Sequence, residues 1–344
     1  ERRNRSSAIS SDGCYVVLHR APRYGPEGHL TQLDALIRSE CYLSPKFKTV
    51  RILNLNARQY HLLTQVALWL LAIIVVSGAA VRLSGSGLGC SDWPNCEPGL
   101  LVPAADFHAW VEFGNRLVTG LVSIAVVLAV LGSLRRVPTS ASLTRWSLGL
   151  VVGVAAQIAL GAVTVLTHLS PPIVMGHFLL SMVLIWNAVV LEDIARPQET
   201  VSNKLPLHKT LRFHAHAVGI GAAVVIVTGT VVTATGPHGG DENVARLDFS
   251  FPDVARIHGS AVVLLLVLVI SLFLRTRHTE ADLFRGRATI VLITTLGQAA
   301  IGYTQYFTQL PVLLVGCHIA GATLLWMATI RLVLASGRHQ VKVV

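Results

Sequence analysis

Charged side chains are scarce in this sequence. Only 13% of the 344 residues are Asp, Glu, Lys or Arg, about half the share found in an average soluble domain, and the mean hydropathy is +0.59. This composition excludes an ordinary soluble globular enzyme and a disordered chain. Cysteine is also rare, with five residues in the whole chain, which excludes a small protein built on a disulfide framework.

Long apolar runs, in contrast, occur eight times. Each run lacks Asp, Glu, Lys and Arg and has the roughly 18–23 residues needed to cross a hydrocarbon core about 30 Å thick. The sequence therefore predicts an all-α integral membrane protein with eight transmembrane helices. The predicted spans are 62–81, 117–134, 146–167, 172–191, 213–235, 257–274, 288–310 and 311–330.

The formal net charge of +10 is distributed unevenly. If the N-terminus is cytoplasmic, 24 of the 28 Lys and Arg lie in the inner segments 1–61, 135–145, 192–212, 275–287 and 331–344. This bias predicts that both termini are cytoplasmic, and it indicates membrane orientation with anionic lipid contact, not nucleic-acid binding. Arg outnumbers Lys 23 to 5, which we interpret as typical of a GC-rich bacterial genome, so the expected location is the bacterial plasma membrane.

An internal repeat is visible in the apolar part of the chain. The segment 157–161 (Gln-Ile-Ala-Leu-Gly) matches 298–302 (Gln-Ala-Ala-Ile-Gly) at an offset of 141 residues, and 77–85 resembles 228–236 at an offset of 151. Each copy contains four predicted helices, so both copies share one orientation in the membrane. We therefore predict two tandem four-helix bundles related by a pseudo-two-fold axis along the membrane normal.

The expected domain organisation follows from this repeat. Residues 1–60 are polar and contain no signal-peptide hydrophobic region, so we interpret them as a cytoplasmic N-terminal extension outside the fold, either native or foreign to the protein. The N-terminal four-helix half is 61–192, and the C-terminal half is 213–336. A cytoplasmic linker, 193–212, joins them, and 337–344 is a cytoplasmic tail.

Histidines in the predicted helices are the candidate ligands. His258 begins the sixth helix and His318 lies seven residues into the eighth, so both imidazoles are expected near the outer surface of the membrane. Two neutral imidazoles that face each other across a four-helix bundle would bind a haem iron axially. The alternative is that each imidazole only forms a hydrogen bond with a neighbouring helix. In the N-terminal copy His177 corresponds to His318, and Asn115 corresponds to His258.

Glu112 and Arg116 are spaced i, i+4 in the second helix, so they share a helix face and neutralise each other. They are either a buried structural ion pair or, beside a haem pocket, a proton donor or acceptor with the cation that fixes its charge. Arg116 is also suited to bind a haem propionate. Asn115 is not a normal iron ligand, so the N-terminal half has one obvious axial histidine.

Cys90 and Cys96 lie in the first outer loop, where an oxidising compartment favours a disulfide. The bond is either structural or a redox-active electron relay, and the C-x5-C spacing does not decide between them. Cys317, next to His318, is interpreted as a packing residue.

Other histidines are expected at the edges of the membrane. His214 and His216 begin the fifth helix at the cytoplasmic edge, and we interpret them as interfacial. His168 and His238 lie in outer loops. His108 precedes Glu112 by one helical turn and would reach the first pocket only from its rim.

Two segments resemble the haem A synthase family. The run 78–96, Gly-Ala-Ala-Val-Arg-Leu-Ser-Gly-Ser-Gly-Leu-Gly-Cys-Ser-Asp-Trp-Pro-Asn-Cys, is similar to the first outer loop of that family, and 110–119, Trp-Val-Glu-Phe-Gly-Asn-Arg-Leu-Val-Thr, is similar to its second helix. The resemblance extends over about residues 61–336 and includes the single histidines of helices four, six and eight. The departure is Asn115, where the family commonly has the His of Glu-x-x-His.

The resemblance implies an enzyme that oxidises the C8 methyl group of haem O to the formyl group of haem A through two hydroxylations and loss of water. It implies a bound haem b between His258 and His318, with haem O near His177, and Glu112 as the family's acidic residue. Cys90 and Cys96 match loop cysteines of many bacterial members. Candidate partners are a haem O synthase and terminal oxidase assembly proteins; nucleic acid is not expected.

Two other classes are alternatives. A dihaem b electron-transfer protein similar to cytochrome b561 or a quinol-linked reductase would need two bis-His haems in opposite leaflets, and only His214 and His216 are available for the inner one. A transporter with parallel repeats would need broken helices and polar sites at the membrane midplane, and neither is evident.

Overall fold

The computed structural model describes residues 54–97, 99, 102–103, 105–197, 207–277 and 281–337, together with the backbone of four two-residue strands. The chain divides into two units, Glu1–Leu53 and Asn54–Val344. In the first unit β1 (Ala8–Ile9) pairs antiparallel with β2 (Tyr15–Val16). Most of the predicted extension 1–60 lies outside the described residues.

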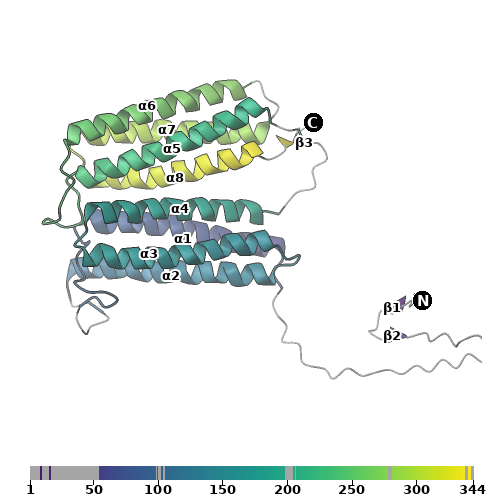
Figure 1. The fold of residues 1–344 in the computed structure, drawn as a ribbon, viewed down its shortest axis with the longest axis horizontal. Helices are drawn as coiled ribbons and strands as arrows, with labels where there is room; N and C mark the ends of the chain where they lie inside the picture. Colours follow the sequence, from purple (N-terminus) through teal and green to yellow (C-terminus); the bar gives the residue numbers. More distant parts are fainter. Residues whose placement is uncertain are drawn as a thin grey trace, which may run out of the picture. The chain divides into compact units, whose positions relative to one another are not determined.

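The described part of the second unit contains eight α-helices (Figure 1). Each of the eight apolar runs predicted from the sequence falls within one helix or overruns its end by at most three residues, which confirms the all-α prediction. Two short strands, β3 (Lys204–Leu205) and β4 (Gln340–Val341), pair antiparallel. The helices are α1 Ala57–Leu83, α2 Phe107–Arg135, α3 Ala141–Leu166, α4 Pro171–Ala195, α5 Lys209–Thr235, α6 Phe251–Thr276, α7 Asp282–Phe307 and α8 Val312–Gly337.

Polar caps extend the helices beyond their apolar runs. Asn56 and Gln59 form a reciprocal capping box at the start of α1, with hydrogen bonds of 2.9 and 3.0 Å. The Asp106 side chain accepts a 2.8 Å hydrogen bond from the backbone nitrogen of Ala109 and begins α2 ten residues before the apolar run. α1 consequently starts at Ala57, before the boundary predicted at residue 61.

Seven of the eight helices are long and apolar enough to cross a membrane, so the chain is a multi-pass membrane protein. α7 does not qualify, and the prediction of eight spans is confirmed only for the other seven. The reason is that the run 288–310 is free of charge but rich in Thr and Gln, which makes α7 the least apolar helix. Absence of charge was therefore a weaker criterion than high hydropathy.

The helices form two groups of four. α1 and α3 each contact α2 and α4, and α5 and α7 each contact α6 and α8. Within each group the even-numbered helices are therefore diagonal neighbours. α8 packs on α1 and α4, and α5 packs on α4, which joins the groups side by side (Figure 1).

The turns that join α3 to α4 and α7 to α8 share an unusual backbone conformation. His168 and Leu169 have φ values of 50° and 57°, and Gln309 and Leu310 have 61° and 58°. These residues are 141 positions apart, the same offset as the sequence repeat. The pseudo-two-fold relation between the helix groups itself stays a prediction.

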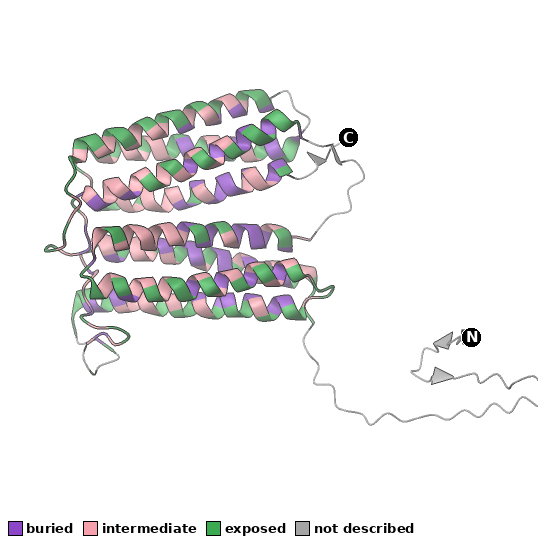
Figure 2. Cartoon of the chain, viewed as in Figure 1, coloured by how far each residue is buried: buried purple, intermediate pink, exposed green. Residues whose placement is uncertain are grey.

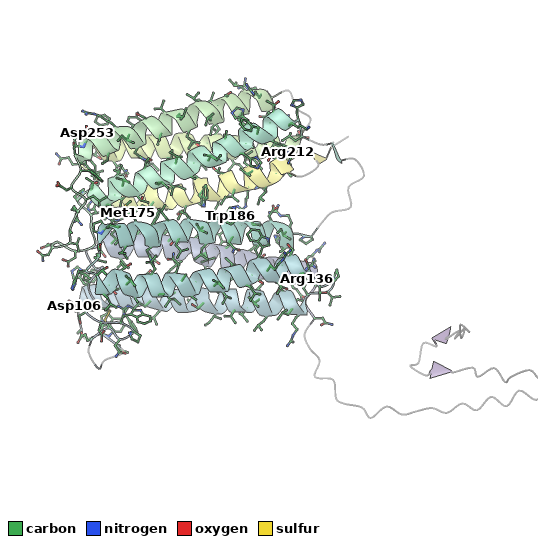
Figure 3. All side chains as sticks on the ribbon, in the orientation of Figure 1. Asp106, Arg136, Met175, Trp186, Arg212 and Asp253 are labelled. Atoms are coloured by element: carbon green, nitrogen blue, oxygen red, sulfur yellow. A yellow bond between two sulfur atoms is a disulfide. The ribbon has the colours of Figure 1, made fainter. Side chains whose placement is uncertain are left out.

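Every helix carries exposed as well as buried residues (Figure 2), and many of the exposed residues are large and apolar. On α2, for example, Leu117, Leu121, Ile124 and Leu128 are all exposed, as expected for a surface that faces lipid. Asp106, Met175 and Asp253 lie at one end of the helices, and Arg136 and Arg212 at the other (Figure 3). We call these the loop end and the basic end.

Candidate functional site

One cavity of about 1140 Å³ reaches into both helix groups near the loop end. This volume slightly exceeds the roughly 300–1,000 Å³ typical of a pocket for one small molecule. Its lining includes six of the residues singled out from the sequence: Glu112, Asn115, Arg116, His177, His258 and His318. The structure therefore brings together candidates that are up to 206 positions apart in the chain.

Four of these residues lie at nearly the same depth. His177 and His318 are the seventh residues of α4 and α8, His258 is the eighth of α6, and Asn115 is the ninth of α2. Because α2 and α4 are diagonal neighbours, as are α6 and α8, each group presents one pair from opposite sides of its bundle. The C-terminal pair is His–His, and the N-terminal pair is His–Asn.

The His258 ring is fixed by Thr228 of α5, whose hydroxyl lies 3.0 Å from Nδ1. The same hydroxyl donates to the carbonyl oxygens of Val224 and Val225, at 3.0 and 3.1 Å. The contact with Thr228 orients the His258 ring through Nδ1. It is compatible with ligation of a metal through Nε2, on the other side of the ring.

Each histidine ring rests against a glycine of the preceding helix. A Cβ atom added to Gly229 would lie 3.2 Å from Cε1 of His258, and one added to Gly302 would lie 3.1 Å from Cε1 of His318. The corresponding distance from Gly161 to His177 is 3.4 Å. Glycine is therefore favoured at these positions of the repeat, because the imidazole ring occupies the space that a larger residue's side chain would fill.

His177 and His318 are also alike in that the Nδ1 atom of each is buried without a hydrogen-bond partner among the described residues. In these residues no group of three or more His, Cys, Asp and Glu could bind a bare metal ion. Two imidazoles that face each other, with no further protein ligand nearby, suit a metal whose remaining ligands belong to a cofactor. A haem is such a group, and histidine is its commonest axial ligand.

The N-terminal pair differs in one contact. Ser77 of α1, which corresponds to Thr228 in the repeat, donates a 2.8 Å hydrogen bond to Oδ1 of Asn115. A Cβ atom added to Gly78, the counterpart of Gly229, would meet nothing within 4 Å. The polar partner is therefore retained, while the space that a histidine ring would occupy above the glycine is open.

Glu112 is buried at the edge of the cavity, with 6% of its surface exposed. Its Oε1 accepts a 2.7 Å hydrogen bond from Arg116, and its Oε2 accepts one of 2.9 Å from the backbone nitrogen of Cys90. Arg116 also donates to the carbonyl oxygens of Asp92 and Asn95, at 3.1 and 2.9 Å. The ion pair predicted from the sequence is present, and it binds the first outer loop to α2.

The same loop carries the two cysteines. Their sulfur atoms are bonded in the structure, and both residues are fully buried against Ala109. Gly89 lies so close to α2 that an added Cβ would be 2.3 Å from the carbonyl oxygen of His108. Trp93 of this loop lines the cavity, so the disulfide lies in a loop that forms part of the cavity wall.

Arg82 connects the two helix groups at the loop end. It lies at the end of α1 and donates to the carbonyl oxygens of Thr233, at 2.8 Å, and His238, at 2.7 Å. Nearby, the backbone nitrogen of Gly87 donates to the carbonyl oxygen of Gly240 at 2.8 Å. This role of Arg82 was not predicted from the sequence.

The remaining histidines lie away from the cavity lining. His108 is 2.9 Å from Ser86 through Nδ1, and His238 donates through Nε2 to the carbonyl oxygen of Leu310. His214 donates to Leu268 at the basic end, where it is buried, whereas His216 is exposed. Cys317 is exposed and free, so its interpretation as a packing residue was wrong.

A buried charged cluster at the basic end was missed. Glu192 of α4 is 1% exposed and accepts from His61 at 2.7 Å, from Arg196 at 2.9 Å and from Arg331 at 3.4 Å. Only the i, i+4 relation of Glu192 and Arg196 was visible in the sequence. The other two partners are more than 130 positions away, in α1 and α8.

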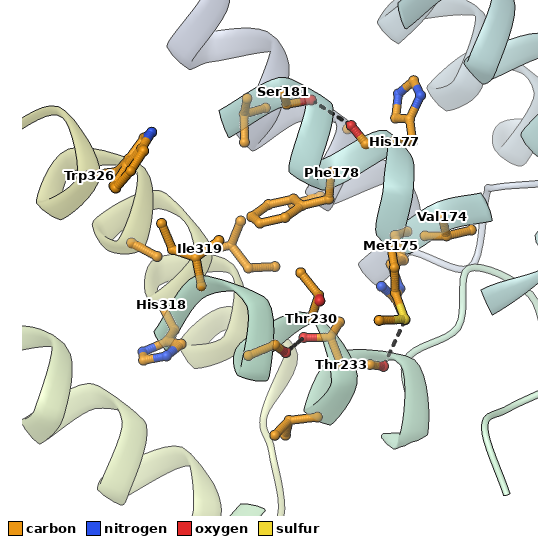
Figure 4. Close-up of a pocket in the computed structure, with 18 of the residues that line it drawn as sticks. Val174, Met175, His177, Phe178, Ser181, Thr230, Thr233, His318, Ile319 and Trp326 are labelled. Carbon is orange, nitrogen blue, oxygen red and sulfur yellow. Dashed lines mark hydrogen bonds between the residues drawn. The ribbon is translucent and has the colours of Figure 1, made fainter. Parts of the chain in front are cut away.

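Apolar side chains separate the two histidine sets. Phe178 of α4 and Ile319 of α8 lie between His177 and His318 (Figure 4). Farther along the helices, the Trp326 indole donates a 2.8 Å hydrogen bond to the carbonyl oxygen of Met182. The cavity thus has two polar ends, one in each group, with an apolar middle.

One protein family and several known proteins are similar in sequence to this chain. The family described as COX15-CtaA, cytochrome oxidase assembly protein, matches residues 61–108 and 102–237. A protein of Lysinibacillus sphaericus named heme A synthase is 33% identical over 172 residues, which are 47% of this chain and 54% of that protein. A protein of the same name from Shouchella clausii is 27% identical over 288 residues, 78% of this chain and 94% of the relative. The one from Bacillus pumilus is 26% identical over 271 residues, 73% of this chain and 86% of the relative.

Proposed function

Because the chain belongs to the COX15-CtaA family of cytochrome oxidase assembly proteins, we propose that it is a haem A synthase, a haem-dependent oxidoreductase. The proposed reaction oxidises the C8 methyl group of haem O to the formyl group of haem A. Two successive hydroxylations give a geminal diol, which loses water. Relatives named heme A synthase that align over 86% and 94% of their own length support this assignment. The observation that carries it is the cavity that His177, His258 and His318 line together.

The resident cofactor in this proposal is haem b, which His258 and His318 would hold. The contact of His258 with Thr228, which orients the ring, and the position of both histidines in the cavity lining support this role. When bound, a haem supplies the iron and conjugated ring that oxidise a C–H bond, chemistry that protein side chains lack. The protein contributes ligands, orientation and proton handling.

The substrate, haem O, is proposed to bind in the N-terminal half with His177 as its one protein ligand. Asn115 stands on the diagonal helix, and its amide does not ligate iron as an imidazole does. An isoprenoid-bearing haem is amphiphilic, so a pocket within the bilayer receives its tail directly from lipid. The apolar middle of the cavity, with Phe178 and Ile319, suits such a tail.

Glu112 and Arg116 have complementary roles in the proposal. Arg116 and the Cys90 N–H fix the Glu112 carboxylate in the cavity wall, from which it would accept or donate a proton. Arg116 also lines the cavity, where its guanidinium would bind a haem propionate. The disulfide loop positions both groups.

We assign the protein to the bacterial plasma membrane, with both termini cytoplasmic and the histidines near the outer surface. The excess of Lys and Arg at the basic end supports this orientation. The halves 61–192 and 213–336, joined by the linker 193–212, are proposed to be related by a pseudo-two-fold axis along the membrane normal. The matching turns at His168–Leu169 and Gln309–Leu310 support that relation.

Candidate partners are the haem O synthase that would supply the substrate and the terminal oxidase assembly that would receive haem A. The alternative of a dihaem electron-transfer protein is less well supported. It would use His214 and His216 as ligands at the basic end. Their rings donate to the carbonyl oxygens of Leu268 and Arg212, at 3.0 and 2.7 Å, and His216 is exposed.

The test is haem extraction and chromatography after expression in membranes that contain haem O and lack any other haem A synthase. We expect haem A to accumulate with the wild type, and to be lost with His177→Ala and with Glu112→Gln. His258→Ala and His318→Ala should each remove the low-spin spectrum of haem b.

His214→Ala is the matched control, because this buried histidine lies at the basic end, and it should retain the haem b spectrum and turnover. Asn115→Ala should reduce turnover less than His177→Ala does. Wild-type protein that carries two haem b and forms no haem A would contradict the proposal and favour the electron-transfer alternative.

A further inference from the structure

We propose that Ser77 and Asn115 form a polar pocket across the N-terminal bundle from His177. The pocket would bind a small ligand that accepts a hydrogen bond, either a neutral diatomic molecule or a diatomic monoanion. The inference deepens the proposed function and rests on it, because the ligand would share a haem with His177. The pocket is a feature of this chain, which has Asn115 where the family commonly has histidine.

The first observation is the direction in which the Asn115 amide is fixed. Ser77 donates to Oδ1 of Asn115 at 2.8 Å, which is shorter than its other hydrogen bond, of 3.2 Å, to the carbonyl oxygen of Ile74. No other hydrogen bond involves the side chain of Asn115 among the described residues. Its Nδ2 therefore keeps both N–H groups for a molecule in the cavity that Asn115 lines.

The second observation is the space next to that amide. In the C-terminal half the His258 ring rests on Gly229, 3.2 Å from the position of an added Cβ atom. In the N-terminal half the same position above Gly78 is empty out to 4 Å. An asparagine is shorter than a histidine, so replacing the ring with an amide leaves room beside a fixed donor for one small molecule.

The charges around the pocket decide the class of ligand. Arg116 is the nearest cation in the sequence, and it is engaged by Glu112 and by the carbonyl oxygens of Asp92, Pro94 and Asn95. The available donor is thus a neutral amide. A neutral amide can donate a hydrogen bond to a small diatomic ligand that is either uncharged or carries one negative charge.

Carbon monoxide and cyanide are the probes for the experiment. We expect the reduced, haem-loaded protein to bind carbon monoxide at the haem in the N-terminal half. The His177→Ala variant should lack this haem and therefore this binding. A hydrogen bond to the oxygen of bound carbon monoxide lowers its C–O stretching frequency. Asn115→Leu retains similar bulk without the donor, so it should raise that frequency and weaken cyanide binding to the oxidised protein about fivefold.

Ser77→Ala should shift the infrared band in the same direction by releasing the amide, and it decides the question if Asn115→Leu inserts poorly. Thr228→Ala is the matched control: it removes the equivalent hydroxyl beside His258, so it should alter the haem b spectrum and leave the carbon monoxide band unchanged. An unaltered low-spin haem b spectrum reports that the Asn115→Leu and Ser77→Ala variants are folded.

An infrared band and a cyanide affinity that are unchanged in both Asn115→Leu and Ser77→Ala would overturn the pocket and leave the proposed function intact. The proposal also fails if the Asn115 side chain presents its oxygen, not its nitrogen, to the cavity. In that orientation it would not donate to bound carbon monoxide, and the C–O stretching frequency of the wild type would not be lowered. Absence of any His177-dependent haem would instead contradict the substrate site, and the pocket with it.

Discussion

Glu112 accepts a 2.9 Å hydrogen bond from the backbone nitrogen of Cys90, which joins the buried carboxylate of α2 to the first residue of the disulfide loop. Arg116 completes the connection by binding Glu112 and the loop carbonyl groups together. The loop and the carboxylate therefore depend on each other for their positions. A change in either one should disturb the other.

Arg116→Met should destabilise the protein by about 3 kcal/mol, because it leaves the Glu112 carboxylate buried without its cation. The measurement is the midpoint of thermal unfolding in detergent. Arg285→Met is the control, since Arg285 pairs with Asp282 at the surface, where an ion pair contributes about 0–1 kcal/mol. Equal midpoints for the two variants would show that the Glu112–Arg116 pair is not structural.

Cys90 and Cys96 should be found as one bridged peptide by mass mapping of freshly purified, unreduced protein. Both sulfurs are buried against α2, so reduction should require partial unfolding of the loop. Replacement of both by serine should lower turnover by loosening Trp93 and Glu112 and leave the haem b spectrum in place. Full turnover in the double variant would exclude both a positioning role and an electron relay.

Gly229→Ala should disturb the haem b spectrum, because the new methyl group would meet the His258 ring at 3.2 Å and displace it. Gly78→Ala, the matched substitution in the other half, places a methyl group in open space and should leave that spectrum unchanged. The comparison is made by optical and electron paramagnetic resonance spectroscopy at equal protein concentration. If the two substitutions have the same effect, the histidine–glycine packing is not what orients the ligand.

Glu192→Gln should lower the thermal midpoint far more than Asp253→Asn. Glu192 is 1% exposed and is bound by two arginines as well as His61, so neutralising it leaves the arginine charges uncompensated, with an expected cost of about 3 kcal/mol. Asp253 pairs with Arg256 in an exposed position and should matter little. A Glu192→Gln midpoint within experimental error of the wild type would contradict the structural role of the cluster.

The helices were predictable because an apolar run of about twenty residues can satisfy its backbone hydrogen bonds inside a membrane only as a helix. Their ends were not, since caps such as Asn56 and Asp106 lie outside the apolar runs. The three cavity histidines could be found because a repeat marks equivalent depths. The pairing of Ser77 with Asn115 could not, because it depends on how α1 and α2 are rotated against each other.

The Glu192 cluster was hidden for a different reason. Its residues come from the ends of three helices in both groups, and each looks in the sequence like an ordinary charge at a membrane edge. Only the packing of α4 against α1 and α8 makes the carboxylate inaccessible to water. A charge that is buried by packing between helices produces no periodic pattern in the sequence.

The two helix groups are joined at three levels: Arg82 at the loop end, Trp326 in the middle and Arg331 at the basic end. Each bond crosses from one group to the other, so a hinge opening at either end would break at least one of them. Relative movement of the two groups would have to break these bonds. Rigid-body rocking of the kind used by alternating-access carriers is therefore opposed at all three levels.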